Sequence, residues 1–219
     1  APSYEYTVTD ADGHQVTVVE KLDTTTLRTY TATLGDTNEL EITADQWLKL
    51  LNGDHALTIT ATDEGSGVKE ISYQLGDGDL QTVTAENGSI TFNVEPEFKG
   101  NIKNVTATDN AGNTSEGIDY EYFAVEKNKP ADVTVDTNGY ESGKWTNDDV
   151  TITVSGSTAT SGIAKYQYST DGGQSWHDMT ATEKTDATAT DPLNVTEAQL
   201  VVSNSGTADY IFRAVSNAG

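Results

Sequence analysis

Residues 57–78 read LTITATDEGSGVKEISYQLGDG, and the same pattern returns without a gap at residues 152–173 as ITVSGSTATSGIAKYQYSTDGG. Apolar residues occupy matching positions in the two copies, and Ser66-Gly67 aligns with Ser161-Gly162. A repeat of this kind indicates that each copy forms its own supersecondary unit. Apolar and polar residues alternate within each copy, which predicts antiparallel strands with one buried face.

A second shared motif closes each copy. Val105–Gly112 reads VTATDNAG and returns at Arg213–Gly219 as RAVSNAG. The two motifs lie further apart in the later copy, so this copy carries an insertion, which we place at Thr180–Pro192. The insertion is rich in Thr, Ala and Asp and lacks apolar anchors, so we expect a mobile surface loop.

We predict three units, at residues 1–53, 54–127 and 128–219, of which the last two contain the copies of the repeat. The strand-like run 57–63 could close the first unit or open the second, so an alternative extends the first unit to residue 64. The linker Lys127–Pro130 is short and contains proline, which favours a semi-rigid connection. The last unit has no counterpart of the closing strand expected at 118–125, so we expect it to lack its last strand and to expose a pairing edge.

The first unit contains the only helix that we predict, near residues 43–52. Thr43 can cap it, Trp47 lies on its apolar side, and Asn52-Gly53 ends it. A helix of this length is marginal alone and needs a sheet to dock on. The predicted fold class is therefore all-β, with tandem antiparallel β-sandwiches and one short helix.

The composition narrows the class of partner. The chain of 219 residues carries 12 basic and 35 acidic residues, for a formal net charge of −23, and has no cysteine. Nucleic acids and anionic membrane surfaces attract basic faces, so we expect neither as a partner. No apolar run approaches the ~18 residues of a membrane span, so we expect no membrane insertion. Disulfides and thiolate metal sites are excluded.

Two stretches resemble a known family. Asp109–Asn113 (DNAGN) and Trp145–Val154 (WTNDDVTITV), with SGIAKYQYSTDGG after the latter, resemble the bacterial Ig-like repeats of large cell-surface and adhesin proteins of the Gram-positive, Firmicutes type. The resemblance covers roughly residues 54–219. The first stretch is similar to Ig-like modules of surface and phage-associated proteins. The resemblance implies Ig-like sandwiches in a protein that is extracellular, at the bacterial surface or secreted.

Acidic turns supply the candidate metal ligands. Asp10 and Asp12 form one D-x-D pair in a glycine-containing turn, Asp77 and Asp79 form another, and Asp109 lies in a further turn. Two close carboxylates with backbone carbonyls can bind calcium, which is the one metal that we consider. The alternative is that these acids only stabilise their turns.

Aromatic residues supply the candidate ligand-binding side chains. Trp145, Trp176, Tyr120 and Tyr122 lie next to turns or in alternating strands, where they could stack on sugars, anchor a protein interface or pack on a sheet. Ser169–Trp176 fits S-x-D-x-G-x-x-W and resembles the Asp-box hairpin of sialidase-like propellers. A propeller needs many such blades, so we expect a structural hairpin capped by its aspartate.

The sequence lacks the motifs of an enzyme. His14, His55 and His177 lie in separate turns or units, and neither a nucleophile elbow nor a phosphate loop occurs. We predict no catalysis. The expected function is that of a monomeric binding region that engages a host protein, such as immunoglobulin or a matrix protein, or a mucin glycan. The alternatives are a structural stalk and a carbohydrate-binding accessory module of a glycosidase.

Overall fold

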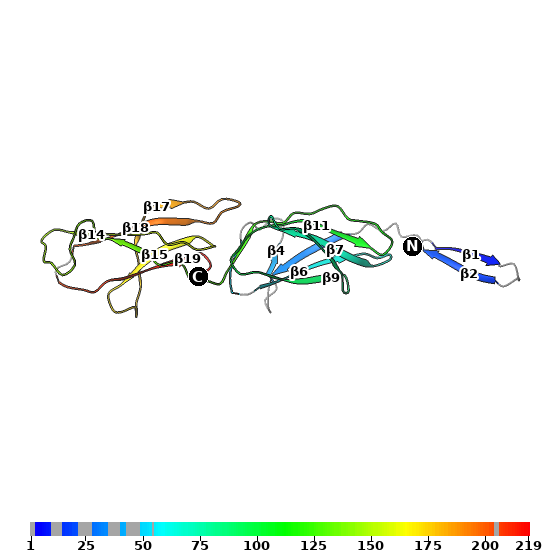
Figure 1. Cartoon of the computed structure of the whole chain (residues 1–219), viewed down its shortest axis with the longest axis horizontal. Helices are drawn as coiled ribbons and strands as arrows, with labels where there is room; N and C mark the ends of the chain where they lie inside the picture. The colour runs from blue at the N-terminus through cyan, green and yellow to red at the C-terminus, as the bar shows by residue number, and fades with distance from the viewer. Residues whose placement is uncertain are drawn as a thin grey trace. The chain divides into compact units, whose positions relative to one another are not determined.

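The computed structural model describes residues 3–9, 15–21, 28–34, 40–42, 49–53, 55–203 and 206–219. Every regular element within them is a β-strand, which confirms the all-β class (Figure 1). The chain divides into two compact units. Unit 1 takes the described parts of residues 1–45, 56–93 and 101–120, and unit 2 takes those of 46–55, 94–100 and 121–219. The boundaries predicted near residues 54 and 128 stay predictions.

Unit 1 has a β-sandwich-like arrangement. Its strands are β3 (Arg28–Leu34), β4 (Leu40–Ile42), β6 (His55–Thr62), β7 (Val68–Leu75), β8 (Leu80–Thr84), β9 (Ser89–Val94) and β11 (Ile102–Asp109). They form one sheet in the order β4-β3-β6-β9 and another in the order β11-β7-β8. The unit also contains a separate antiparallel pair, β1 (Ser3–Thr9) with β2 (Gln15–Lys21).

Period-two burial builds the core of unit 1. Leu57, Ile59 and Ile71 are fully buried, while their neighbours along β6 and β7 are not. The ring of Tyr73 stacks on Phe92 with centroids 4.0 Å apart. Complete burial of one such aliphatic side chain stabilises the fold by about 1.5–3 kcal/mol. The alternation predicted for residues 57–78 is therefore confirmed.

The sheet of unit 1 joins residues from both sides of position 54. Strand β3 pairs antiparallel with β6, and Ala32 lies opposite Ile59. The strand-like run 57–63, which the sequence could assign to either neighbour, thus pairs with a strand that precedes it by about twenty-five residues of chain.

The helix predicted near residues 43–52 is wrong at its C-terminal end. Lys49–Asn52 forms strand β5, which pairs parallel with β12 (Phe123–Glu126), while residues 43–48, Trp47 included, lie outside the described residues. The backbone of β12 gives the segment ready hydrogen-bond partners, and an isolated short helix is too marginal to compete. The N–H of Gly53 extends the pairing by donating to the carbonyl of Glu126 at 2.8 Å.

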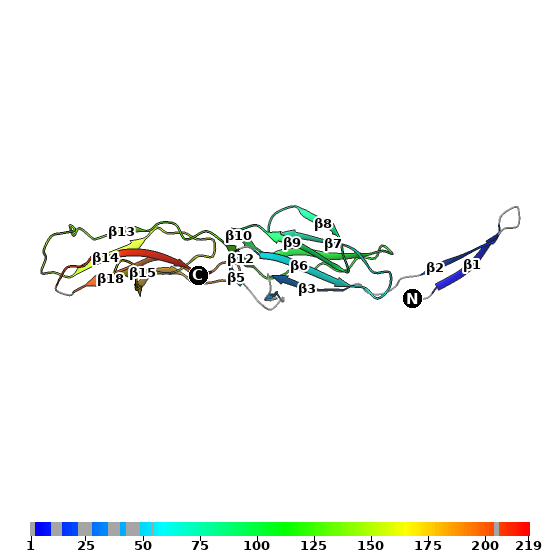
Figure 2. The same cartoon turned by 90° about the horizontal axis from the view of Figure 1, so that it is seen from below.

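Unit 2 combines a sandwich-like pair of sheets with a smaller sheet (Figure 2). Its further strands are β10 (Phe98–Gly100), β13 (Thr134–Asp136), β14 (Val150–Ser155), β15 (Ile163–Ser169), β16 (His177–Asp178), β17 (Thr180–Thr185), β18 (Asn194–Val202) and β19 (Ile211–Ser216). The sheet orders are β13-β14-β18-β17, β16-β15-β19 and β10-β12-β5. Buried residues between the first two sheets include Val154, Ile163 and Tyr166.

The insertion in the later copy is partly a strand. Thr180–Thr185 forms β17 and pairs antiparallel with β18, with two shifts of register. The surface loop that we predicted there is therefore wrong for these six residues. Alternating threonines favour extended backbone, and the edge of β18 offers donors and acceptors that need partners.

One general feature bears on membranes. In the part of the chain that the structure describes, no helix is long and apolar enough to cross a bilayer.

Candidate functional site

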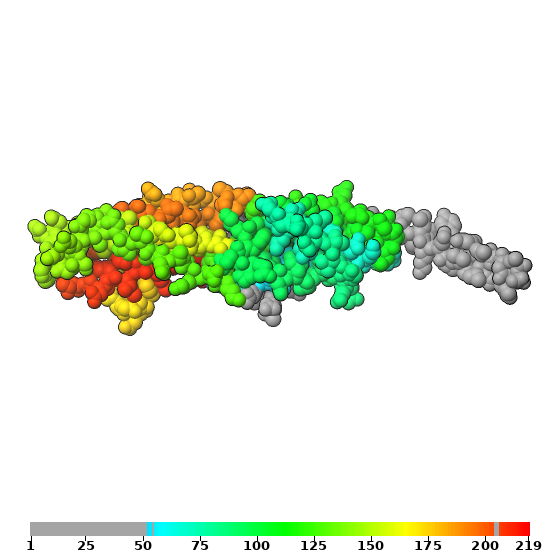
Figure 3. Space-filling view, in the orientation of Figure 1, coloured from blue at the N-terminus to red at the C-terminus, as the bar shows by residue number. Residues whose placement is uncertain are grey.

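Trp145 is the most exposed large hydrophobic residue among the residues from 52 onward whose exposure the structure describes. Its side chain is 82% exposed, and it lies on the segment between β13 and β14. This segment, light green in Figures 1 and 3, forms one end of unit 2 and is open to solvent. We call residues 137–149 the Trp145 loop.

Hydrogen bonds order the Trp145 loop. The hydroxyl of Tyr140 donates to the carbonyl of Lys144 at 2.6 Å, and the hydroxyl of Thr137 donates to the carbonyl of Tyr140 at 2.7 Å. Asn138 has a positive φ of 52°, and its side-chain amide donates to the carbonyl of Thr151 in β14 at 3.0 Å. A loop that is ordered in this way loses little further entropy when a partner binds.

Trp176 lies in a different environment. The guanidinium carbon of Arg213 lies 4.0 Å from the centre of its ring, and a Cβ at Gly173 would lie 3.5 Å from its Cζ2. Arg213 also donates to Oε1 of Gln167 through Nε at 2.9 Å and Nη2 at 2.7 Å, and Gln167 donates to Asp178 at 2.6 Å. A sugar could stack on the Arg213 side of this ring only by displacing the arginine from a bonded network.

The hairpin before Trp176 is capped by its aspartate, as predicted. Oδ1 of Asp171 accepts from the hydroxyl of Ser169 at 2.6 Å and from the N–H of Ser175 at 2.9 Å. Oδ2 accepts from the hydroxyl of Ser175 at 2.5 Å. The hydroxyls of Ser169 and Ser175 stabilise the carboxylate and hold the pKa of Asp171 well below its usual range. These bonds indicate that the residues of the Asp-box pattern stabilise the hairpin.

The acidic turns do not gather a set of metal ligands in the described residues. Asp77 accepts a hydrogen bond from Nζ of Lys103 at 3.0 Å, and the carbonyl of Asp79 accepts one from the side chain of Gln81 at 3.2 Å. Within the ranges described above, no group of three or more His, Cys, Asp and Glu residues could hold a metal ion. Asp10 and Asp12 lie outside the described residues. Calcium binding therefore stays a prediction.

The buried carboxylate of Asp109 stabilises its own turn. Its Oδ1 accepts from the N–H groups of Ala111 at 2.9 Å and Asn113 at 2.8 Å, and its Oδ2 accepts from the side-chain amide of Asn113 at 2.7 Å. Asn110 donates to the carbonyls of Ser66 and Gly67 at 3.0 and 2.9 Å. The DNAGN turn thus fastens β11 to the loop before β7.

The same fastening occurs in unit 2. The side-chain amide of Asn217 donates to the carbonyls of Ser161 at 2.7 Å and Leu193 at 2.6 Å. The N–H of Ala218 donates to the hydroxyl of Ser161 at 3.0 Å, as that of Ala111 does in unit 1 to Ser66 at 3.1 Å. The two short motifs that repeat in the sequence therefore contact each other in each unit, and their role is structural.

The two tyrosine candidates are less accessible than Trp145. Tyr120 is 7% exposed, its N–H donates to the carbonyl of Ile102 at 2.7 Å, and burial raises the pKa of its phenol. Tyr122 is half-buried. Neither ring offers a face as open as that of Trp145.

A carboxylate that the sequence analysis did not select joins the small sheet of unit 2 to its sandwich. Oε1 of Glu97 accepts from the N–H groups of Lys127 at 2.9 Å and Asn128 at 2.8 Å, and its Oε2 accepts from the hydroxyl of Thr160 at 2.5 Å. The bond from Thr160 and those from the two backbone N–H groups lower the pKa of Glu97. Glu97 also has a positive φ of 67°, so these bonds offset a conformation that L-residues disfavour.

A second glutamate supports the same joint. Oε2 of Glu126 accepts from the N–H of Ser161 at 2.7 Å, and both residues are buried. Lys99 in β10 pairs with Asp191 at 2.8 Å. We call the contacts of Glu97 and Glu126 the glutamate clasp. Nothing in the local sequence predicted it, because its donors lie about 30 and 60 residues away.

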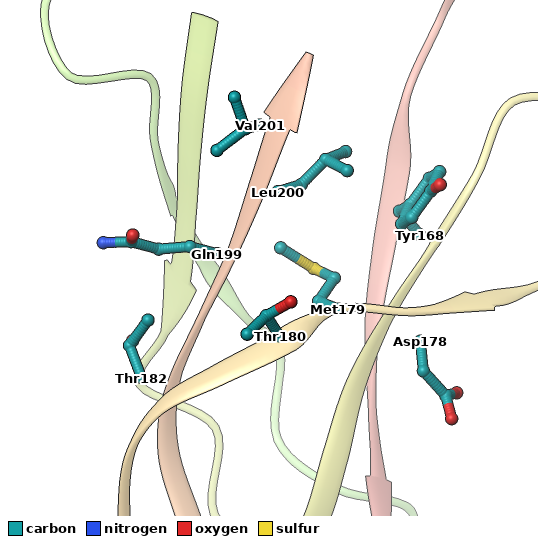
Figure 4. A pocket seen from close by; sticks show the side chains of 8 residues that line it. All are labelled: Tyr168, Asp178, Met179, Thr180, Thr182, Gln199, Leu200 and Val201. Atoms are coloured by element: carbon teal, nitrogen blue, oxygen red, sulfur yellow. The ribbon is translucent and has the colours of Figure 1, made fainter. Parts of the chain in front are cut away.

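A hollow of about 400 Å³ opens on unit 2 between β15 and the edge formed by β17 and β18. Figure 4 shows Met179 between Leu200 and Tyr168, which gives the hollow an apolar floor. Its lining residues are Tyr168, Asp178, Met179, Thr180, Thr182, Gln199, Leu200 and Val201. The one acid among them, Asp178, is already bonded to Gln167 and Lys165. We assign no reaction to this hollow.

Comparison with known proteins identified no family for this chain. No family model matches the chain, and no curated protein matches it. The function is therefore inferred from the residues themselves.

Proposed function

We propose that this chain is a non-catalytic, extracellular binding region of a bacterial surface or secreted protein, built from tandem Ig-like sandwiches. Two observations support the tandem arrangement. The sheets β3-β6-β9 and β8-β7-β11 have counterparts in the same order in β13-β14-β18 and β16-β15-β19, and the repeated sequence motifs make the same contacts in both.

The observation that carries the binding role is the exposure of Trp145 on an ordered loop. A tryptophan buries about 150–250 Å² when a partner covers it. At about 25 cal/mol per Å², that burial corresponds to ~4–6 kcal/mol before the entropy of association is subtracted. Tryptophan is among the residues that most often dominate protein interfaces. An ordered loop with an open indole ring is therefore well suited to anchor a partner.

The test is capture of partners by the purified chain. The wild-type chain and Trp145→Ala are immobilised, and human serum proteins, including immunoglobulin, and mucin fractions are passed over each, with and without a calcium chelator. Val201→Ala is the matched control, because Val201 is also exposed, at 56%, in unit 2. We expect a retained partner that survives chelation, is lost with Trp145→Ala and is kept with Val201→Ala. Equal retention by all three proteins would show that Trp145 is not the anchor.

A spacer is the second candidate function, and the glutamate clasp favours it. Glu97 binds the N–H groups of Lys127 and Asn128 in the short linker, and the buried bond between Ser161 and Glu126 holds the residue just before it. A stalk that projects another part of a protein needs stiff joints of this kind. Absence of any retained material in the capture experiment would refute the binding role and leave the spacer as the better account. A neutral glycan captured through Trp145 would instead favour the accessory-module reading.

A further inference from the structure

We propose that the Trp145 loop binds a positively charged segment of a protein, with a lysine or arginine side chain of the partner placed on the Trp145 ring. This inference rests on the proposed binding function and adds the chemistry of the partner. Three features of unit 2 support it: the open ring of Trp145, the charged residues near it in the chain, and a cation that lies on the ring of another tryptophan.

The Trp145 ring is the one side chain in the loop that is large, apolar and open to solvent. It is 82% exposed, and the loop is ordered by the bonds from Tyr140, Thr137 and Asn138. The face of an indole ring carries negative electrostatic potential, so it attracts cations more strongly than any other side-chain ring does. The ring therefore offers both apolar area and a site for a cation.

The charged residues near Trp145 in the chain favour the same partner. Glu141, Asp148 and Asp149 lie within four residues of Trp145, all exposed, against the single cation Lys144. In the part of the chain that the structure describes, no lysine or arginine forms an ion pair with these three carboxylates. They are free to pair with cationic groups that a partner brings to the ring.

Unit 2 contains an example of this contact. The guanidinium of Arg213 lies 4.0 Å from the centre of the Trp176 ring, and Gln167 links it to the carboxylate of Asp178. At Trp176 the chain supplies its own cation. At Trp145 the ring and the carboxylates are present, and a partner would supply the cation.

The total charge disfavours the opposite chemistry. The chain carries a formal net charge of −23, so an acidic glycan or a nucleic acid would approach the loop against repulsion. A neutral sugar could stack on the ring and donate its hydroxyls to the carboxylates, but it would leave their charge uncompensated. The proposal therefore commits to a basic protein segment and leaves a neutral sugar as an outcome of the test.

The experiment follows the indole N–H signals of the ¹⁵N-labelled whole chain by NMR at 150 mM salt. The probe is a ten-residue peptide of alternating arginine and glycine. Its controls are the glutamate–glycine counterpart and a neutral hexose oligomer. The signal of Trp145 is assigned by its loss in Trp145→Ala. We expect the arginine peptide to shift the Trp145 signal and leave the Trp176 signal in place, because Arg213 already occupies that ring.

Variants separate specific binding from general attraction to an acidic protein. We expect Trp145→Ala to weaken the arginine peptide about tenfold, which corresponds to ~1.4 kcal/mol. Asp148→Asn combined with Asp149→Asn should weaken it about threefold to fivefold, and Val201→Ala should leave it unchanged. Raising the salt should weaken binding to the wild type more than binding to the double variant.

Two results would overturn the inference. One is an arginine peptide that fails to shift the Trp145 signal, and the other is an affinity that Trp145→Ala leaves unchanged. If the hexose oligomer alone shifts the signal, the loop binds sugar and the cationic partner is refuted. If Trp145→Ala abolishes capture of a serum or mucin component while the arginine peptide does not bind, the proposed function stands and only its partner chemistry fails.

Discussion

Removal of the Glu97 carboxylate tests how the small sheet of unit 2 is joined to the sandwich. Glu97 accepts hydrogen bonds from the N–H groups of Lys127 and Asn128 and from the hydroxyl of Thr160. In Glu97→Ala all three donors lose their acceptor. Alanine at a φ of 67° is about as strained as glutamate, so the backbone contribution is nearly unchanged. The variant therefore isolates the side-chain bonds.

The expected loss of unfolding free energy in Glu97→Ala follows from these three bonds. A hydrogen bond contributes about 0.5–1.5 kcal/mol net, which gives ~1.5–4.5 kcal/mol for the set. Glu97 is half-buried, so water replaces part of what is lost, and we expect a loss of ~2 kcal/mol. Glu97→Gln should lose about half as much, because its amide oxygen still accepts from the backbone while its amide nitrogen cannot accept from Thr160.

The assay combines urea unfolding with trypsin cleavage of the linker. The backbone N–H of Lys127 donates to Glu97, so opening of the joint frees the backbone around the Lys127–Asn128 bond to enter the active site of trypsin, whereas the Lys129–Pro130 bond resists this protease. A loss of ~2 kcal/mol in the joint raises the open fraction, and hence the cleavage rate, about 30-fold. Glu95→Ala is the control, because Glu95 is an exposed glutamate two positions away. Cleavage of Glu97→Ala at the same rate as Glu95→Ala would refute the reasoning.

The pH dependence of stability gives an independent test of the role of Glu97. The pKa of Glu97 in the folded chain is below the ordinary carboxyl value of about 4.5 because Thr160 and two backbone N–H groups stabilise the charged form. A depressed pKa stabilises the fold above the unfolded value, and this contribution is lost as the pH falls through the folded value. The difference in unfolding free energy between wild type and Glu97→Ala should be full above pH ~4.5 and should shrink at lower pH. A difference that grows on acidification would contradict the assignment.

Three further variants probe the fold around the candidate sites. Asn217→Ala removes two bonds to backbone carbonyls, so urea unfolding should show a loss of ~1–3 kcal/mol. Gly162→Ala should lower the free energy of unfolding by roughly 2 kcal/mol more than Gly172→Ala does. Its thermal midpoint should therefore also be the lower of the two. Both glycines have positive φ, but only at Gly162 would a Cβ lie 2.5 Å from a backbone carbonyl oxygen; equal midpoints would count against this packing. Arg213→Ala should uncover Trp176, which acrylamide quenching of fluorescence would report as increased access; an unchanged quenching constant would show that the arginine does not cover the ring.

The sequence predicted those parts of the fold that depend on neighbouring residues. Alternation identified the strands at Leu57–Asp63 and Ile163–Ser169 because a half-buried strand buries every second side chain. It also identified the turn of Asp109, since a short acid before Asn and Gly can accept bonds from its own backbone. Such features can be read from a few residues because the atoms involved are only a few residues apart.

The elements that the sequence predicted wrongly depend on residues that are far away in the chain. Lys49–Asn52 forms a strand because β12, more than 70 residues later, pairs with it, and Thr180–Thr185 forms one because β18 offers an edge. Local propensity favoured a helix in the first case and a loop in the second, and pairing with a distant strand outweighed both preferences. Glu97 was missed for the same reason, since its donors come from a linker and a loop that the sequence does not place beside it.

The two tryptophans show most directly where sequence reasoning ends for the candidate site. Trp145 and Trp176 both follow a polar, glycine-containing turn, and nothing in the residues around them separates an open ring from a covered one. What separates them is Arg213 in β19, which lies over the ring of Trp176 although it is far from it in the sequence. Arg213 is held there by its hydrogen bond to Gln167 on the neighbouring strand β15. The Trp145 loop is ordered by hydrogen bonds among its own residues, and the Trp145 ring is left open to solvent. The contact with Arg213 that covers Trp176 therefore also indicates which kind of side chain Trp145 would accept.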